Sequence, residues 1–194
     1  MQINWFELLL ISVRRPRDGM SRLLDMEFNN TQLFQLSVLA ICLISIFLFC
    51  VVSSFGTLLP NSLDIQENQV NISSMLQSIK PINIVISGVI SFVARGVALN
   101  YFARLFNGGG NLRQSIMCLA WFDIIHSIGL AFIFIGLWIS LTITIMITLL
   151  GTIWLLWIAV SFISVLHQFT NLTFVFLGMI AGYFLLHFAL NLVF

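Results

Sequence analysis

The residues of this sequence that could do chemistry inside its long apolar stretches are above all the ionisable side chains of Arg95, Asp123 and His126. A charged group within a membrane costs at least a few kcal/mol, so each of these residues needs a partner or a function. Connected in a row, the three groups form a relay for protons or ions. Held in contact, the arginine and the carboxylate form an ion pair that fixes the register of two helices.

Spacing along the chain places two of these charges at the same depth. Arg95 lies nine residues before Arg104, and Asp123 lies ten residues after Arg113. At 1.5 Å rise per residue, each charge is roughly 14 Å from the same short loop. The two helices are expected to be antiparallel neighbours, so the sequence predicts a buried Arg95–Asp123 pair.

The same arithmetic pairs Ser91 with His126, one turn deeper. His126 follows Asp123 by three residues and therefore shares its helix face. His187, in the last apolar stretch, would extend this polar cluster outward. We favour the structural pair over the relay, because a transport path needs polar residues on more helices and the fourth span offers only hydroxyls.

Metal and enzyme chemistry are not expected. Asp123, His126 and His187 are too scattered to form a convincing metal site, and no cofactor is implied. The chain has no zinc-binding His-Glu-x-x-His and no nucleophile Gly-x-Ser-x-Gly. The sequence therefore predicts a protein without catalytic residues.

Composition explains why these charges stand out. Charged residues make up 8 % of the 194 residues and hydrophobic residues 60 %, with 19 phenylalanines. A soluble fold could not bury that much apolar surface, whereas lipid can solvate it. The net charge of +1 argues against a nucleic-acid partner. The expected fold class is all-α, a polytopic membrane protein whose partner is the lipid bilayer, with other membrane proteins or a second copy as further partners.

Five apolar stretches are long enough to cross a bilayer. The spans are expected at about residues 33–55, 81–103, 115–135, 141–166 and 172–194. The connection between the third and fourth spans, near residues 136–142, is only faintly marked, and the alternative there is one broken or tilted helix. Residues 1–32 precede the spans. Within them, residues 4–13 are expected to form an interfacial helix that Pro16 ends, and a second helix is expected near residues 18–27.

Basic residues orient the five-span bundle. With the N-terminus inside, the inner segments carry the following residues: Arg14, Arg15, Arg17, Arg22, Arg104 and Arg113. The outer loop carries only Lys80, beside two acids. By the positive-inside rule the N-terminus is cytoplasmic and the C-terminus outside. These arginines either set the topology alone or also bind anionic headgroups, each contributing about 1 kcal/mol.

Three short patterns carry a resemblance to a known family. The first is Val13-Arg-Arg-Pro-Arg-Asp-Gly19, between Leu8 and Leu23-Leu24. The second is Tyr101-Phe-Ala-Arg-Leu-Phe-Asn-Gly-Gly-Gly-Asn-Leu-Arg-Gln-Ser115, a glycine loop and then a Gln that opens a helix. The third is His167-Gln-Phe, similar to a His-Gly-Phe of related bacterial chains, with Gln168 in place of the glycine. In these patterns the chain resembles the Yip domain family, the Ypt/Rab-interacting proteins, and in particular its short bacterial members.

The resemblance implies a five-span bundle with a cytoplasmic N-terminus in a bacterial inner membrane. Eukaryotic members act in Golgi and endoplasmic reticulum traffic and bind Rab GTPases through longer cytoplasmic regions. The short segment before the first span here does not favour GTPase binding, and the family implies no catalytic residues. We expect a non-enzymatic protein that works through protein or lipid contacts in membrane organisation, with a small proton- or ion-coupled transporter or channel as the alternative.

Overall fold

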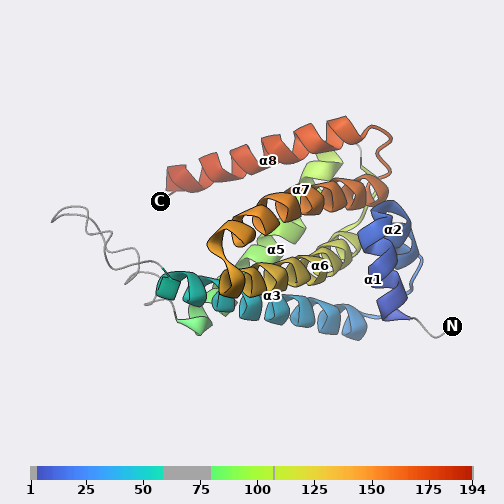
Figure 1. The fold of residues 1–194 in the computed structure, drawn as a ribbon. Helices are drawn as coiled ribbons and strands as arrows, with labels where there is room; N and C mark the ends of the chain where they lie inside the picture. Colours follow the sequence, from blue (N-terminus) through green and yellow to red (C-terminus); the bar gives the residue numbers. More distant parts are fainter. Residues whose placement is uncertain (1–3, 59–79, 107, 194) are drawn as a thin grey trace.

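The structure, a computed structural model, describes residues 4–58, 80–106 and 108–193 as helices and short connections. Two short helices are followed by longer ones (Figure 1). The elements are α1 (Trp5–Arg14), α2 (Pro16–Leu24), α3 (Asn30–Leu58), α5 (Pro81–Leu105), α6 (Leu112–Ile139), α7 (Leu141–Leu166) and α8 (Leu172–Val193). The expected all-α membrane bundle, preceded by a short helical segment, is confirmed.

Four of the described helices are long and apolar enough to cross a membrane. These candidate spans are Asn30–Phe55, Pro81–Tyr101, Leu112–Ile139 and Leu141–Leu166. In α8, the apolar stretch with described side chains, Leu172–Gly182, is shorter than a span, although the helix itself continues to Val193. Every expected span coincides with a helix.

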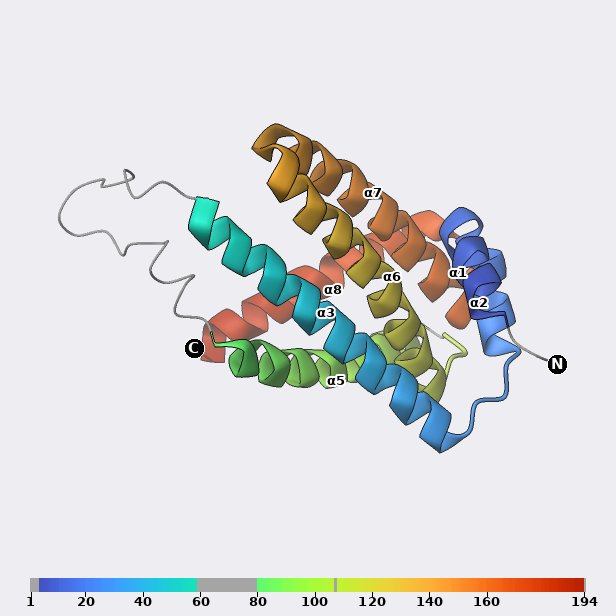
Figure 2. The same cartoon turned by 60° about the horizontal axis from the view of Figure 1, so that its bottom comes forward.

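Helix α6 lies at the centre of the bundle. It contacts α3, α5 and α7, while α8 packs on α7. Figures 1 and 2 show that the long helices alternate in direction, so that the ends of α5 and α7 lie beside the starts of α3, α6 and α8. The short helices α1 and α2 pack at this same end, which we call the hairpin end.

The α1–α2 hairpin (residues 5–24) turns on a single residue. Asn4 caps α1 by accepting a hydrogen bond from the Glu7 backbone N–H at 3.2 Å. Arg15 ends α1, and Pro16 opens α2, where its missing N–H leaves no intrahelical bond unmade. Helix α2 thus begins at Pro16, before the expected start at residue 18, and ends at Leu24, before the expected end at residue 27. It begins early because the proline that stops one helix also starts the next.

The hairpin packs into the bundle, a contact that the interfacial interpretation did not include. Leu8, Met20 and Leu23 are buried in the same apolar core as α6 and α7 residues. The hairpin therefore packs against the ends of α6 and α7 at this side of the bundle.

A single residue, Ser140, joins α6 to α7. The connection expected near residues 136–142 lies at Ser140, within that range, although α6 continues to Ile139, past the expected span end at residue 135. Inside a membrane no water competes for the backbone, so glycine does not end a helix there as it can in water. Gly136 instead permits close packing: a Cβ atom on it would lie 3.1 Å from Thr144 Oγ1 and 3.4 Å from Thr144 Cα.

Candidate functional site

Arg95 and Asp123 form the ion pair that their depth predicts. Arg95 Nη1 and Nη2 donate to the two carboxylate oxygens of Asp123, each at 2.9 Å. The Asp123 side chain is fully buried, whereas 36 % of the Arg95 side chain is exposed. Such a two-point contact satisfies both carboxylate oxygens and fixes the geometry of the pair.

Close packing of α5 on α6 brings these two residues together. Phe92 is buried, and Gly96 faces α6, where a Cβ atom would lie 3.5 Å from Ile116 Cγ1 and 3.9 Å from Leu119 Cδ2. Arg95 lies at the edge of this contact face. Its long side chain reaches inward to Asp123, which is buried on α6.

The predicted pairing of Ser91 with His126 was wrong. The Ser91 side chain is exposed, and only its carbonyl takes part, accepting a hydrogen bond from Arg95 Nε at 3.4 Å. Ser91 lies on the exposed edge of α5, and its short side chain cannot cross the distance that arginine spans. Counting residues from the loop did not predict the direction in which the Ser91 side chain points around α5.

His126 is half-buried beside Phe122, with ring centroids 6.1 Å apart. Within the described part of the chain it makes no hydrogen bond. His187 lies in α8, but its side chain is outside the described residues. Among the described residues, no group of three His, Cys, Asp or Glu side chains could hold a metal ion.

Two of the patterns that carry the family resemblance meet at the hairpin end. The Gly110 backbone N–H donates to His167 Nδ1 at 3.2 Å, and the Gly109 N–H donates to the His167 carbonyl at 3.4 Å. His167 is buried at the end of α7, and burial lowers its pKa to about 4. The imidazole is therefore neutral at physiological pH, which leaves Nδ1 free to accept the loop N–H.

The residue after this histidine adopts a backbone conformation that is typical of glycine. Gln168 has φ of 58°, in the left-handed region that glycine enters without steric cost. A glycine at this position would satisfy the same backbone turn. The departure at Gln168 thus keeps the conformation while accepting local strain.

A second polar contact attaches the hairpin to α6, and sequence reasoning missed it. Trp121 Nε1 donates to Ser12 Oγ at 2.9 Å, and both side chains are buried. Gly19 of α2 lies against Ser12 so closely that a Cβ atom there would be 2.5 Å from Ser12 Cα and 2.8 Å from its N. The only sequence signal was the small residues Ser12 and Gly19 on facing short helices, which by themselves name no partner.

The arginines of the hairpin end divide into free and engaged groups. Arg14, Arg15 and Arg17 are exposed and make no ion pair within the described residues. Two others make contacts with residues of the same chain at the surface: Arg22 pairs with Glu7 at 3.5 Å, and Arg113 Nη2 donates to the Phe28 carbonyl. Arg104 is exposed at the end of α5.

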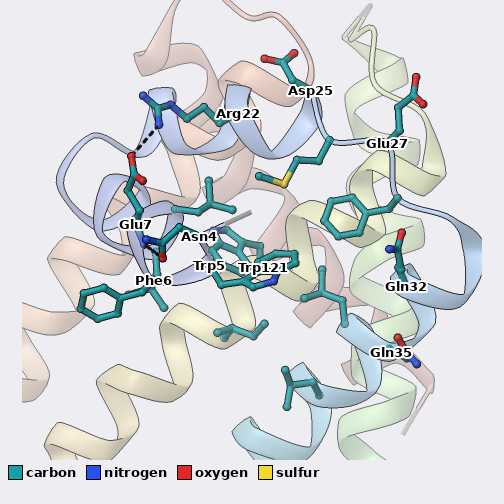
Figure 3. A pocket seen from close by; sticks show the side chains of 17 residues that line it. Asn4, Trp5, Phe6, Glu7, Arg22, Asp25, Glu27, Gln32, Gln35 and Trp121 are labelled. Atoms are coloured by element: carbon teal, nitrogen blue, oxygen red, sulfur yellow. Dashed lines mark hydrogen bonds and ion pairs between the residues drawn. The ribbon is translucent and has the colours of Figure 1, made fainter. Parts of the chain in front are cut away.

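An open groove of about 1330 Å³ lies between α1, the α2–α3 connection and the first turns of α3 (Figure 3). Its apolar floor includes Trp5, Leu36, Leu39, Trp121 and Ile124. Charged and amide side chains surround it: Glu7, Arg22, Asp25, Glu27, Gln32 and Gln35. This volume is above the usual range for small-molecule sites, so the groove is a candidate binding surface at the hairpin end.

The comparisons agree with the patterns quoted from the sequence. The model of the Yip1 domain family matches residues 11–193, which is nearly the whole chain. No curated protein and no solved structure matches. The matched region contains all the long helices, most of the hairpin and the Gly110–His167 contact, and the chain belongs to the Yip1 domain family.

Proposed function

We propose that this membrane protein of the Yip1 family is non-enzymatic and acts through lipid or protein contacts in membrane organisation. In this proposal it crosses a bacterial inner membrane five times. Its N-terminus is cytoplasmic, its C-terminus is outside, and its hairpin end is the contact surface.

The closed Arg95–Asp123 pair carries this proposal. Both oxygens of the fully buried carboxylate are held by one arginine. The hydroxyls of Thr144, Thr148 and Thr152 likewise bond to carbonyls of their own helix. Polar groups engaged in this way support a scaffold, because a transport path or active site needs groups free to bind a substrate.

The arrangement of charges supports the proposed orientation. The α1–α2 hairpin, the end of α5 and the start of α6 lie at one end of the bundle (Figure 1), and they carry the arginines named above. Lys80 lies at the start of α5, at the opposite end. A reporter fused after Phe194 is expected outside the cytoplasm, and a cytoplasmic reporter would contradict the five-span arrangement.

The lipid contact is testable with the full chain reconstituted in neutral vesicles. Vesicles with α1 outward are expected to associate with anionic vesicles, and high salt should weaken the association. The exposed arginines contribute about 1 kcal/mol each. The triple variant Arg14→Gln/Arg15→Gln/Arg17→Gln should therefore lower the association by about two orders of magnitude.

Lys80→Gln is the matched control, because it removes one positive charge at the other end of the bundle. It should leave the association unchanged. Association that survives the triple variant would mean that these arginines set topology without binding headgroups.

One observation favours the alternative, a small proton- or ion-coupled transporter or channel. Arg95 is partly exposed in the middle of a candidate span, and the half-buried His126 lies one turn from its carboxylate partner. Reconstituted vesicles should then show a pH-dependent flux that Asp123→Asn abolishes. A flux that is absent from the unmodified protein would rule this alternative out.

A further inference from the structure

The groove at the hairpin end changes from polar to apolar with depth. Gln32 and Gln35 line it on the first turns of α3, and Leu36 and Leu39 follow deeper on the same helix. From Gln32 to Leu39 the helix rises about 10 Å. The groove thus begins where the first candidate span begins and continues into the apolar part of the bundle. Its change from polar to apolar along this direction matches that of a lipid, from the headgroup to the acyl chains.

Aromatic side chains form the back of the groove. Trp5 stacks at an angle against Trp121 and Phe28, with ring centroids 6.0 Å and 6.1 Å away. Trp5 is 45 % exposed, and Leu39 is 50 % exposed. These residues offer an open apolar surface to a hydrocarbon chain that approaches from the membrane.

The charges on the rim are mostly negative. Arg22 is paired with Glu7 at 3.5 Å, so these two charges offset each other. Asp25 and Glu27 are exposed at the edge above the aromatic rings and make no ion pair within the described residues (Figure 3). The rim therefore complements a positively charged group and repels an anionic one.

We propose that this groove binds one zwitterionic aminophospholipid, with an acyl chain on the apolar floor and the headgroup ammonium beside Asp25 and Glu27. This inference rests on the proposed function, since it names one of its lipid contacts. It assigns that lipid to a different surface from Arg14, Arg15 and Arg17, which do not line the groove. The chain would accordingly bind anionic headgroups with its exposed arginines and select an amine headgroup in the groove.

Quenching of tryptophan fluorescence tests the proposal in the full chain. The protein is reconstituted in equimolar vesicles of phosphatidylethanolamine and phosphatidylglycerol, with brominated acyl chains on one of the two lipids only. Exchanging the label leaves the composition of the membrane constant. The difference between the unmodified protein and Trp5→Phe isolates the signal of Trp5, and phenylalanine keeps an aromatic ring in the groove.

Bromine on the ethanolamine lipid is expected to quench Trp5 about threefold more than bromine on the glycerol lipid, as exposed ion pairs of this kind allow. The variant Asp25→Asn/Glu27→Gln should bring this ratio to about one. Asp18→Asn is the matched control: it removes an exposed carboxylate from the nearby helix α2, outside the groove, and should keep the ratio.

Three results would overturn the proposal. A ratio of one in the unmodified protein would remove the headgroup preference, and a ratio below one would assign the groove to anionic lipid. Trp5 that neither label quenches would exclude lipid from the groove and favour an amphipathic segment of a partner protein. Because the arginines that bind anionic vesicles lie elsewhere, these results are distinguishable from failure of the proposed function.

Discussion

The close crossing of α1 and α2 gives the sharpest prediction. Gly19→Ala would place a Cβ atom against the Ser12 backbone, 2.5 Å from Cα and 2.8 Å from N. Overpacking of this kind costs about 1–3 kcal/mol. Moving α1 away also loses the Trp121–Ser12 hydrogen bond, about 1 kcal/mol, while alanine regains about 1 kcal/mol of helix propensity.

The net expectation is that Gly19→Ala weakens docking of the hairpin by about 2 kcal/mol, roughly a thirtyfold change in the docked population. Hydrogen exchange in detergent or nanodiscs is the appropriate assay. Amides of residues 5–24 should exchange faster, and those of α6 and α7 should change little. Gly151→Ala is the matched control, because no atom lies within 4 Å of a Cβ at Gly151.

The double variant Ser12→Ala/Gly19→Ala distinguishes a clash of the new Cβ atom with the Ser12 backbone from a clash with the Ser12 hydroxyl. It removes the hydroxyl but leaves the backbone atoms that the new Cβ would meet, so exchange should remain fast. Exchange in Gly19→Ala as slow as in the unmodified protein would refute the close crossing. Full rescue by Ser12→Ala would show that only the hydroxyl was in the way.

Three further substitutions test the contacts within the bundle. Asp123→Asn should lower the free energy of unfolding by about 2–3 kcal/mol, less than for a fully buried pair because part of Arg95 is exposed. Denaturant titration in detergent measures it, and Arg95→Leu/Asp123→Leu should recover most of the loss. Gly110→Ala, whose Cβ would lie 2.8 Å from the imidazole ring beneath it, should destabilise the protein by about 1–3 kcal/mol. Gly109→Ala, with 3.9 Å available, should melt like the unmodified protein, and equal melting of both variants would contradict the docked loop. Gln168→Gly should raise the free energy of unfolding by about 0.5–1 kcal/mol, since it relieves a left-handed backbone, and a loss of stability would show that the glutamine side chain compensates for the strain.

The depth of a residue within the bundle was predictable from the sequence, whereas the direction in which its side chain points around the helix was not. The rise of a helix is fixed, so counting from the shared loop placed Arg95 opposite Asp123. The same count placed Ser91 opposite His126, yet Ser91 lies on an exposed edge. The rotation of one helix about its axis depends on packing, which apolar sequences with little periodic contrast do not encode.

The docking of the α1–α2 hairpin on α6 could not be predicted from the sequence, because it depends on a contact between residues far apart in the chain. A polar contact between one serine and one tryptophan carries no spacing signal when the two lie on separate helices. The bounds of α7 were predicted to the residue. Helix α6, in contrast, extends past Gly136, because inside a membrane no water competes for the backbone hydrogen bonds and glycine does not end the helix there.

The contact between Ser12 and Trp121 determines when the hairpin can dock during synthesis of the chain. Trp121 follows Ser12 by 109 residues. At the usual pace of a ribosome, the hairpin therefore leaves the tunnel on the order of ten seconds before its docking partner exists. During that interval α3 and the bilayer surface are present, but the contacts of the hairpin with α6 and α7 cannot form. Docking of the hairpin on α6 therefore has to follow the synthesis of α6, however early the hairpin itself folds.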